Sequence, residues 1–434
     1  MKKVLIITYY WLPSGGAGVQ RWVKFAKYLR EFGWEPVIYT PENPEYPSLD
    51  HSFMNDIPGD VEIVKTPIWE PFDIYRSLFG KKGQTINAGF ISEDKEKGWK
   101  EKLSVWIRGN FLIPDPRRFW VRPSVKFLCE YLKENPVDAM ITTGPPHSMH
   151  LIGMKMKRLF PDLIWVADFR DPWTNIDFYK DLHLMKWADD KHHRLEKRVV
   201  RNADAITVVS SGMQEEFQLM QPKALHIIPN GYDEDDVKII QPPLDTHFTI
   251  SHIGTLNSAR NPVVIWKALK YLCAENENFN KDLRIQLIGK IDFSILESVK
   301  KYGLKKHLIK TEYITHDEAV KKQQSSQVLL LLINRSANAK GILTGKFFEY
   351  LASKRPVLGV GPLDGDAARV LNETGTGMMV DFDDLAAAKK AIIGYYELYQ
   401  KNELILETSS VDHYSRRNLT RELSVLLNQM TTHA

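Results

Sequence analysis

The amino-acid sequence predicts an α/β protein with two doubly wound domains, each built around a parallel sheet, that face a central cleft. The chain has 434 residues, too many for one ordinary hydrophobic core and suited to two domains of about 200 residues each. Short apolar runs bounded by Gly, Pro, Asn and Asp alternate with helical segments in both halves, as in buried parallel strands. An acidic, proline-bearing stretch at 233–247 separates the two halves and is interpreted as the linker.

The first predicted domain covers residues 1–238. A glycine-rich turn follows its first strand and leads into a helix over 19–32, and a further helix is expected over 123–134. A C-terminal helix over about 412–434 is expected to pack back on this domain. The apolar runs that we interpret as strands are 3–10, 35–40, 61–67, 138–144, 164–169, 205–210 and 224–230.

The second predicted domain covers residues 247–411. Its run 327–334, QVLLLLIN, lacks polar alternation and is expected to form a central strand covered on both faces. Ligands of doubly wound sheets bind at the carboxyl ends of the strands, so two such sheets face to face would form a cleft there. The strands expected in this domain are 248–254, 283–289, 308–314, 327–334, 355–361 and 377–382.

Composition and charge limit the classes of function. A net charge of +4 is only mildly basic and no recognised nucleic-acid-binding module accompanies it, so we expect no nucleic-acid partner. The two cysteines, Cys129 and Cys273, indicate neither a disulfide framework nor a zinc site and fit a reducing compartment. The N-terminal apolar run is short and ends at Pro13, which favours a strand over a signal peptide. No run reaches the ~18–20 apolar residues that span a bilayer, so we expect a cytoplasmic protein.

A basic and aromatic segment, Lys95–Lys133, lies within a long irregular insertion. It holds ten Lys and Arg against four Asp and Glu, together with several tryptophans and phenylalanines. Cations beside tryptophans favour peripheral contact with anionic lipid at the inner face of the cell membrane. The alternative is a solvated insertion whose tryptophans pack on their own domain, and the sequence favours neither.

Three stretches of the first domain follow strands and carry candidate site residues. The turn around Gly15 and Gly16 precedes a helix, whose free N–H groups could bind an anion; the alternative is a plain strand-to-helix connection. The stretch GPPHS ends a strand at His147, although a lone histidine is usually structural. The stretch ADFRDPW places polar side chains at another strand end, where an ion-pair network is the alternative to function. These polar residues are Asp168, Arg170 and Asp171.

The second domain repeats this arrangement. Gly254 ends a strand and Arg260 follows in a loop before a helix, which is a suitable place for a diphosphate. The later stretch GILTGKFF is not a P-loop, because three residues rather than four separate its glycines and Phe347 replaces the magnesium-binding Ser or Thr. What remains is a glycine loop before a helix, a general phosphate cradle formed by Thr344, Gly345 and Lys346.

One acidic residue, Glu349, stands among large apolar residues in GKFFEYLASKRPVL. We expect it in the first turn of the helix that begins at the glycine loop. A solvated helix face would explain the carboxylate, and so would a ligand hydroxyl.

Six stretches in this order carry a resemblance to a known family: GGAGVQR, GPPHS, ADFRDPW, IPNGYD, IGT with Arg260, and FFEYLASKRPVL. The chain resembles the retaining, GT-B fold glycosyltransferases of the family 4 type, also called glycosyl transferases group 1. The pair GPPHS and DFRDPW is similar to the bacterial surface-polysaccharide branch. The resemblance implies two Rossmann-like domains and transfer of a sugar from a UDP- or GDP-sugar, with retention, to a saccharide or lipid-linked acceptor. It implies neither a metal nor a cofactor.

The resemblance also implies roles for single residues. Glu349 matches the family's glutamate that binds the ribose hydroxyls of the donor, and Gly15 and Gly16 would approach its diphosphate. The family's basic pair is reduced to Arg260, because Gly254-Thr255 stands where Gly-Arg is usual. The donor-binding set implied is Gly15, Gly16, Gly254, Arg260, Thr344, Gly345, Lys346 and Glu349. Arg260 and Lys346 would stabilise the leaving diphosphate.

Two departures from the family pattern concern the sugar and the acceptor. Gly341 stands where relatives carry a second glutamate that contacts the donor sugar, and Arg170-Asp171 stands where many carry His-Asp. His147 and Asp171 are expected to orient the acceptor, with Asp168 and Arg170 beside them. Two other functions remain open, a nucleotide-sugar 2-epimerase of the same fold and a catalytically inactive nucleotide-sugar-binding scaffold.

Overall fold

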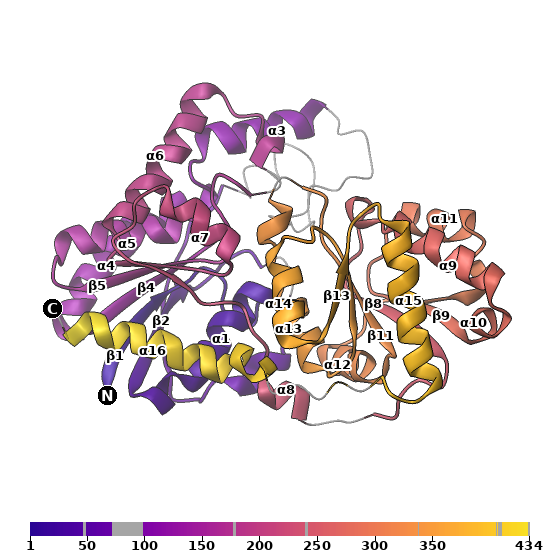
Figure 1. Cartoon of the computed structure of the whole chain (residues 1–434). Coiled ribbons are helices and arrows are strands. Elements are labelled where there is room, and N and C mark those ends of the chain that lie inside the picture. The colour runs from indigo at the N-terminus through magenta and orange to yellow at the C-terminus, as the bar shows by residue number, and fades with distance from the viewer. Residues whose placement is uncertain are drawn as a thin grey trace. The chain divides into compact units, whose positions relative to one another are not determined.

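The computed structural model (Figure 1) describes residues 1–46, 49–71, 99–176, 179–238, 242–336, 338–404, 406 and 410–432. The chain divides into two compact units, the first formed by Met1–Pro229 with Leu419–Ala434 and the second by Asn230–Asn418. Each unit holds one parallel sheet, which confirms the predicted pair of doubly wound α/β domains. That the two sheets face a central cleft stays a prediction. The stretch interpreted as a linker, 233–247, follows the division and includes a short helix.

The first unit contains, in its described residues, a seven-stranded sheet in the order β3-β2-β1-β4-β5-β6-β7. The order reverses between β1 and β4, so their carboxyl ends form the switch point at which doubly wound sheets bind ligands. Its strands are β1 (Lys2–Ile7), β2 (Trp34–Pro41), β3 (Glu62–Thr66), β4 (Ala139–Gly144), β5 (Ile164–Phe169), β6 (Ala205–Val208) and β7 (Leu225–Ile227). Its helices are α1 (Ala17–Leu29), α3 (Trp99–Phe111), α4 (Val121–Glu134), α5 (Ser148–Leu159), α6 (Lys186–Asn202) and α7 (Ser211–Gln218), with short turns η1 (Arg30–Phe32), η2 (Ser52–Asp56), η3 (Pro116–Trp120) and η4 (Tyr179–Leu182).

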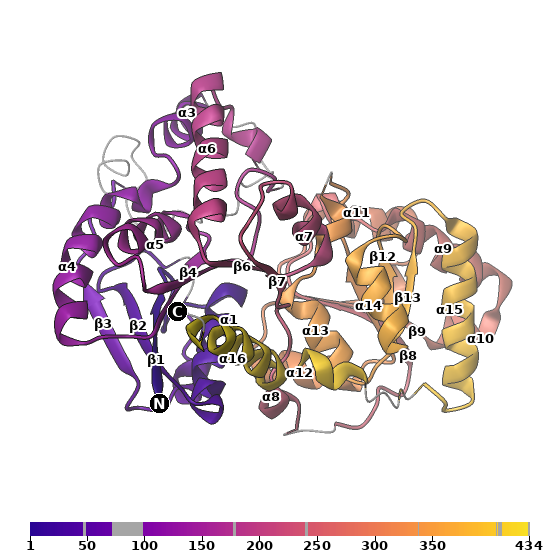
Figure 2. The same ribbon diagram turned by 60° about the vertical axis from the view of Figure 1, so that its left-hand side comes forward.

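Both faces of the central strands of this sheet are buried. Side chains of a strand alternate between faces, so Leu5 and Ile7 of β1 join one core whereas Val4 and Ile6 join the other. Helices α4, α5 and α6 supply the first core. Helix α1 and the C-terminal helix α16 (Arg416–Thr432) both supply the second core (Figure 2). This double covering explains the continuous apolar runs in the sequence.

The second unit contains, in its described residues, a six-stranded sheet in the order β10-β9-β8-β11-β12-β13. Its strands are β8 (Phe248–Ile253), β9 (Leu283–Ile288), β10 (Leu308–Thr311), β11 (Val328–Leu332), β12 (Val357–Val360) and β13 (Gly377–Val380). Its helices are α8 (Glu234–Lys238), α9 (Val263–Glu275), α10 (Glu277–Asp282), α11 (Phe293–Lys301), α12 (His316–Ser325), α13 (Gly345–Ala352), α14 (Asp366–Thr374) and α15 (Leu385–Gln400), with short turns η5 (Ser258–Arg260), η6 (Lys305–His307), η7 (Ala339–Gly341) and η8 (Ser410–Tyr414).

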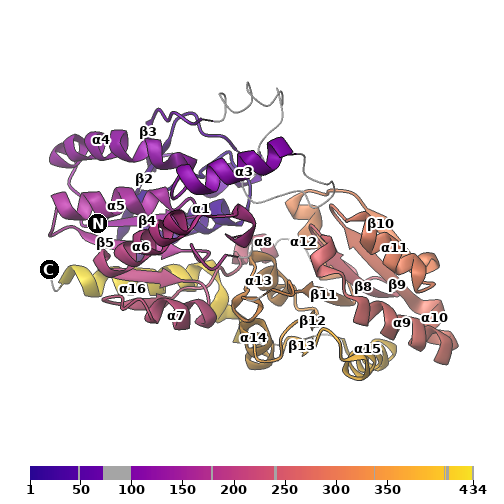
Figure 3. The same cartoon turned by 90° about the horizontal axis from the view of Figure 1, so that it is seen from above.

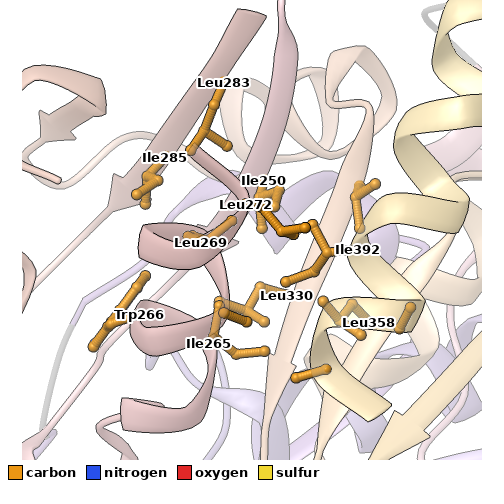
Figure 4. Packing of buried hydrophobic residues seen from close by; sticks show 14 of the residues in the cluster. Ile250, Ile265, Trp266, Leu269, Leu272, Leu283, Ile285, Leu330, Leu358 and Ile392 are labelled. Carbon is orange, nitrogen blue, oxygen red and sulfur yellow. The ribbon is translucent and has the colours of Figure 1, made fainter. Parts of the chain in front are cut away.

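Helices α9, α10 and α15 lie together on one face of the second sheet (Figure 3). In Figure 4 the side chains of Leu330 and Leu358 lie among those of Ile265 and Leu269 of α9 and Ile392 of α15. Strand β11 is buried along its whole length, as its unbroken apolar sequence predicted. Helices α13 and α14 pack on the other face. The carboxyl ends of β8 and β11, neighbours at the centre of this sheet, are thereby held in a rigid frame.

Candidate functional site

The carboxyl end of β8 brings Gly254 against Lys346. Gly254 has a φ of +123° and its N–H donates to the carbonyl of Ile288 at 2.7 Å, so this backbone conformation favours glycine. A Cβ at this position would overlap the ammonium group of Lys346. The glycine therefore provides the space in which a cation rests directly on the strand end.

Helix α13 carries that cation. It begins at Gly345 after Thr344, and its first turn holds no acidic residue, so its N–H groups present the positive end of the helix dipole. The hydroxyl of Tyr350 accepts a hydrogen bond from the N–H of Ile253 at 2.9 Å, which ties the helix to the end of β8. Phe347 and its apolar neighbours anchor the other face of the helix in the core.

Glu349 lies on the same helix, half-buried. Because α13 begins at Gly345, Glu349 stands in the second turn rather than the first turn that the sequence suggested. Its Oε2 accepts a hydrogen bond from Nε2 of the buried Gln323 at 3.1 Å. The amide fixes the orientation of the carboxylate, which is a suitable acceptor for ligand hydroxyl groups.

Two neighbouring groups adjust the charge of Lys346. Burial and the nearby guanidinium of Arg260 lower the pKa of Lys346 to about 8, against an opposing effect of Glu349. Arg260, in η5, donates through Nε to Oδ1 of Asn334 at 2.5 Å, beyond the end of β11. The two cations thus converge at one edge of the sheet, where an anion would relieve their repulsion.

One buried residue beside this edge was not predicted from the sequence as part of the site. His252, 2% exposed in β8, is hydrogen-bonded through Nδ1 to the carbonyl of Leu330 at 3.0 Å. Burial, Lys346 and Arg260 lower its pKa to about 3, so the imidazole stays neutral. Its only sequence signal is a polar residue within an otherwise apolar strand. Gly341, which stands where the family pattern has a second glutamate, lies in η7 and supplies no carboxylate.

In the first unit, Asp168 is the centre of a buried hydrogen-bond network. Its carboxylate, 1% exposed, accepts hydrogen bonds from Arg21, Trp22, Thr143 and Thr207 at 2.8–3.3 Å. Burial would raise the pKa of the Asp168 carboxyl, but Arg21 and these donors hold it below its ordinary value. These contacts hold strand ends together; a place on the acceptor side stays a prediction.

Arg170 lies over the glycine turn at the start of α1. A Cβ at position 18 would overlap the Arg170 guanidinium, so only glycine fits there while this guanidinium keeps its place. Nε of Arg170 donates to Oγ1 of Thr143 at 3.1 Å and Nη2 donates to the carbonyl of Pro145. Burial lowers the pKa of Arg170. The acceptors of these two hydrogen bonds are neutral oxygens, and the guanidinium lies against the positive end of helix α1.

His147 and Asp171 share a cavity of about 450 Å³ within the first unit. The His147 ring stacks on Trp173 with centroids 4.8 Å apart and planes within 2°. Burial lowers the pKa of His147 well below its ordinary value, so the ring is neutral. Asp168 and Arg170 are not among the lining residues. Those that the sequence did not single out include Tyr10, Arg108, Trp173, Tyr179 and His192.

The comparisons with known proteins point to one fold. Residues 91–236 match the model of Glycosyltransferase Family 4; residues 91–98, 177 and 178 of this match lie outside the described part of the chain. No curated protein matches in sequence. Among solved structures, sucrose-phosphate synthase from Thermosynechococcus elongatus is 14% identical, with full coverage of both chains and a TM-score of 0.62.

Two further structures are similarly distant in sequence. HepE from Anabaena in complex with UDP-glucose is 12% identical, covers 100% of this chain and 99% of its own, and has a TM-score of 0.56. WaaG, a glycosyltransferase involved in lipopolysaccharide biosynthesis, is 12% identical, with 99% coverage of each chain and a TM-score of 0.53. The chain therefore has the two-domain fold of the GT-B glycosyltransferases, and its residues 91–236 match the Glycosyltransferase Family 4 model.

Proposed function

We propose that the protein is a retaining glycosyltransferase that uses a UDP- or GDP-sugar as donor. The acceptor is a saccharide or a lipid-linked saccharide, and the cellular role is synthesis of a bacterial surface polysaccharide. The observation that carries the proposal is the Lys346 ammonium resting on Gly254, with Glu349 one turn further along the same helix. The Family 4 match and the fold of the UDP-glucose complex support it.

On this proposal, α13 binds the nucleotide. The Glu349 carboxylate, oriented by Gln323, accepts hydrogen bonds from the two ribose hydroxyls. The diphosphate lies at the start of α13, where helix N–H groups, Lys346 and Arg260 meet its charge. Gly15 and Gly16 of the first unit remain proposed contacts of the same diphosphate.

Electrostatic stabilisation of the leaving group is the central catalytic effect. As the bond from the anomeric carbon to the diphosphate oxygen breaks, negative charge grows on the diphosphate and the sugar becomes oxocarbenium-like. Lys346 and Arg260 stabilise that charge, so no metal is needed for this purpose. The acceptor hydroxyl bonds to the same face of the anomeric carbon while its proton passes to the leaving phosphate oxygen.

The cavity at His147 and Asp171 is proposed to bind the acceptor. The neutral imidazole and the exposed carboxylate can each hydrogen-bond a sugar hydroxyl, and Trp173 and Tyr179 provide aromatic surface. A cytoplasmic location is part of the proposal, and it fits the free thiols of Cys129 and Cys273.

Calorimetric titration with UDP, GDP and their sugars tests the donor site. We expect one nucleotide class to bind and Glu349→Ala to abolish that binding while leaving the unfolding temperature unchanged. Glu297→Ala, at an exposed position of α11, is the matched control and should bind as the wild type does. Unchanged affinity in Glu349→Ala would refute the assignment.

Product analysis tests the reaction. With the bound donor and a panel of saccharides, we expect a glycoside of the donor's own anomeric configuration, formed equally well in the presence of a metal chelator. A donor epimerised at C2 would identify a 2-epimerase instead. Binding without transfer or slow hydrolysis would identify an inactive scaffold. An inverted product would overturn retention.

A further inference from the structure

Helix α3 carries an exposed apolar stripe. Leu103, Ile107 and Phe111 follow one another at intervals of four residues and therefore lie on one face of the helix. Their exposed fractions are 39%, 38% and 52%. Single exposed apolar residues are normal, but a helix face of three is a feature that a partner would cover.

The stripe continues onto neighbouring elements of the same unit. The Phe111 ring lies 5.8 Å from that of Trp187, at the start of α6. Arg118 donates to the Phe111 carbonyl at 2.8 Å and lies over the Phe119 ring, which in turn contacts Trp69 with centroids 4.8 Å apart. Helices α3 and α6 lie side by side (Figures 1 and 2). These residues form one surface, the α3 surface, of Trp69, Leu103, Ile107, Phe111, Phe119 and Trp187.

The α3 surface combines aromatic rings with cations. Arg118 lies inside it and the exposed Lys186 adjoins Trp187. The segment Lys95–Lys133 has six more positive than negative residues, although 95–98 lie outside the described chain. Tryptophan and cationic side chains together suit the boundary between headgroups and acyl chains of an anionic bilayer. A second copy of the surface would bring like charges together, which disfavours self-association.

The α3 surface lies next to the cavity proposed to bind the acceptor. Arg108 and Gly109 of α3, directly after Ile107 of the stripe, line the cavity that holds His147 and Asp171. A membrane held against α3 would therefore lie beside the proposed acceptor site. An acceptor carried on a lipid could enter this cavity without leaving the bilayer surface.

We propose that the α3 surface docks on an anionic phospholipid bilayer and presents the cavity to a lipid-borne acceptor. The second part rests on the proposed function; the docking itself does not. Among the described residues, no helix is long and apolar enough to cross a membrane. The contact is therefore peripheral, with aromatic side chains inserted at the interface and cations facing lipid phosphates.

Vesicle co-sedimentation of the full-length chain tests the docking. Vesicles of phosphatidylcholine alone are compared with vesicles containing phosphatidylglycerol, at low and high salt. We expect binding to the anionic vesicles that weakens with salt, and a loss of about tenfold or more in Phe111→Ser/Trp187→Ser. Lys186→Gln should lose roughly fivefold, the loss expected of one cation near an anionic surface. The matched control is Leu219→Ser, at an 83% exposed leucine of the same unit, which should bind normally.

Several results would overturn the proposal. They are absence of wild-type binding to anionic vesicles, equal loss in Leu219→Ser, and a concentration-dependent dimer that Phe111→Ser/Trp187→Ser abolishes. The double variant is first shown to be folded by its unfolding temperature and circular dichroism. Nucleotide titration of the same samples separates the two hypotheses, because failure of nucleotide binding refutes the proposed function while vesicle binding still supports the docking.

Discussion

Lys346 is expected to give nucleotide binding an alkaline limit. Its pKa is lowered from 10.5 to about 8 in the free protein, by burial and by Arg260. About 90% of the side chains are then charged at pH 7 and about 10% at pH 9. Because a charge-assisted hydrogen bond contributes about 1.5–3 kcal/mol, its loss weakens diphosphate binding by a factor of about 10–150.

The same shift affects stability in the opposite direction. The unfolded chain holds the Lys346 proton up to its ordinary pKa, whereas the folded protein releases it near pH 8. The unfolded state thus binds more protons between about pH 8 and 10.5, so this group makes the folded protein more stable as pH rises through that window. A bound diphosphate reverses the effect, because it raises the pKa of the lysine.

Calorimetric titration with UDP between pH 7 and 9.5 checks this reasoning. UDP itself is fully ionised over most of this range, since the second phosphate ionisation lies near pH 6. We expect wild-type affinity to fall above pH 8, Lys346→Arg to remain flat, and Lys346→Met to bind weakly at every pH. Lys267→Met, at an exposed position of α9, is the control. A wild-type affinity that is flat across this range, or a pH limit that persists in Lys346→Met, would refute the reasoning.

Two further predictions concern the first unit. Asp168→Asn should lower the free energy of unfolding by about 3–5 kcal/mol in urea titrations, because it leaves the 1% exposed Arg21 without its carboxylate. The exposed Asp171→Asn should change it by less than about 0.5 kcal/mol, and similar values for both would contradict the buried network. Gly18→Ala should lower the unfolding temperature, since its Cβ overlaps the Arg170 guanidinium, and adding Arg170→Ala should restore it. A Gly18→Ala protein as stable as the wild type would show that the guanidinium moves freely.

Much of the fold could be predicted because both sheets are covered on two faces. The central strands then appear as mainly apolar runs, and β11 with its five consecutive Val and Leu is the clearest case, whereas the edge strands β3 and β10 are largely exposed. The order of the strands could not be predicted in this way, because the pairing of β8 with β11 joins residues about 78 positions apart. The sequence placed helix boundaries less precisely: Glu349 was expected in the first turn of α13 and lies in the second.

The site was predictable only in part, for a related reason. Lys346 and Gly254 were both candidates, but nothing local in either stretch indicates that one rests on the other. His252 has its partner, the Leu330 carbonyl, on the neighbouring strand. The cavity around His147 draws residues from α3 and η4, which the chain brings to it from stretches far from His147 in the sequence. Chemistry that depends on such long-range contacts has no signature in a single stretch of sequence.

The hydrogen bond from the Ile253 N–H to the Tyr350 hydroxyl sets the position of helix α13 along its axis. It fixes the helix to the end of β8, so the distance from that strand end to each residue of the helix is set. Lys346 and Glu349 are three residues apart, or about 4.5 Å along the axis. On the proposed function this fixed spacing lets one anchored helix hold the ribose through Glu349 and the diphosphate through Lys346, so the two contacts form together when the nucleotide binds.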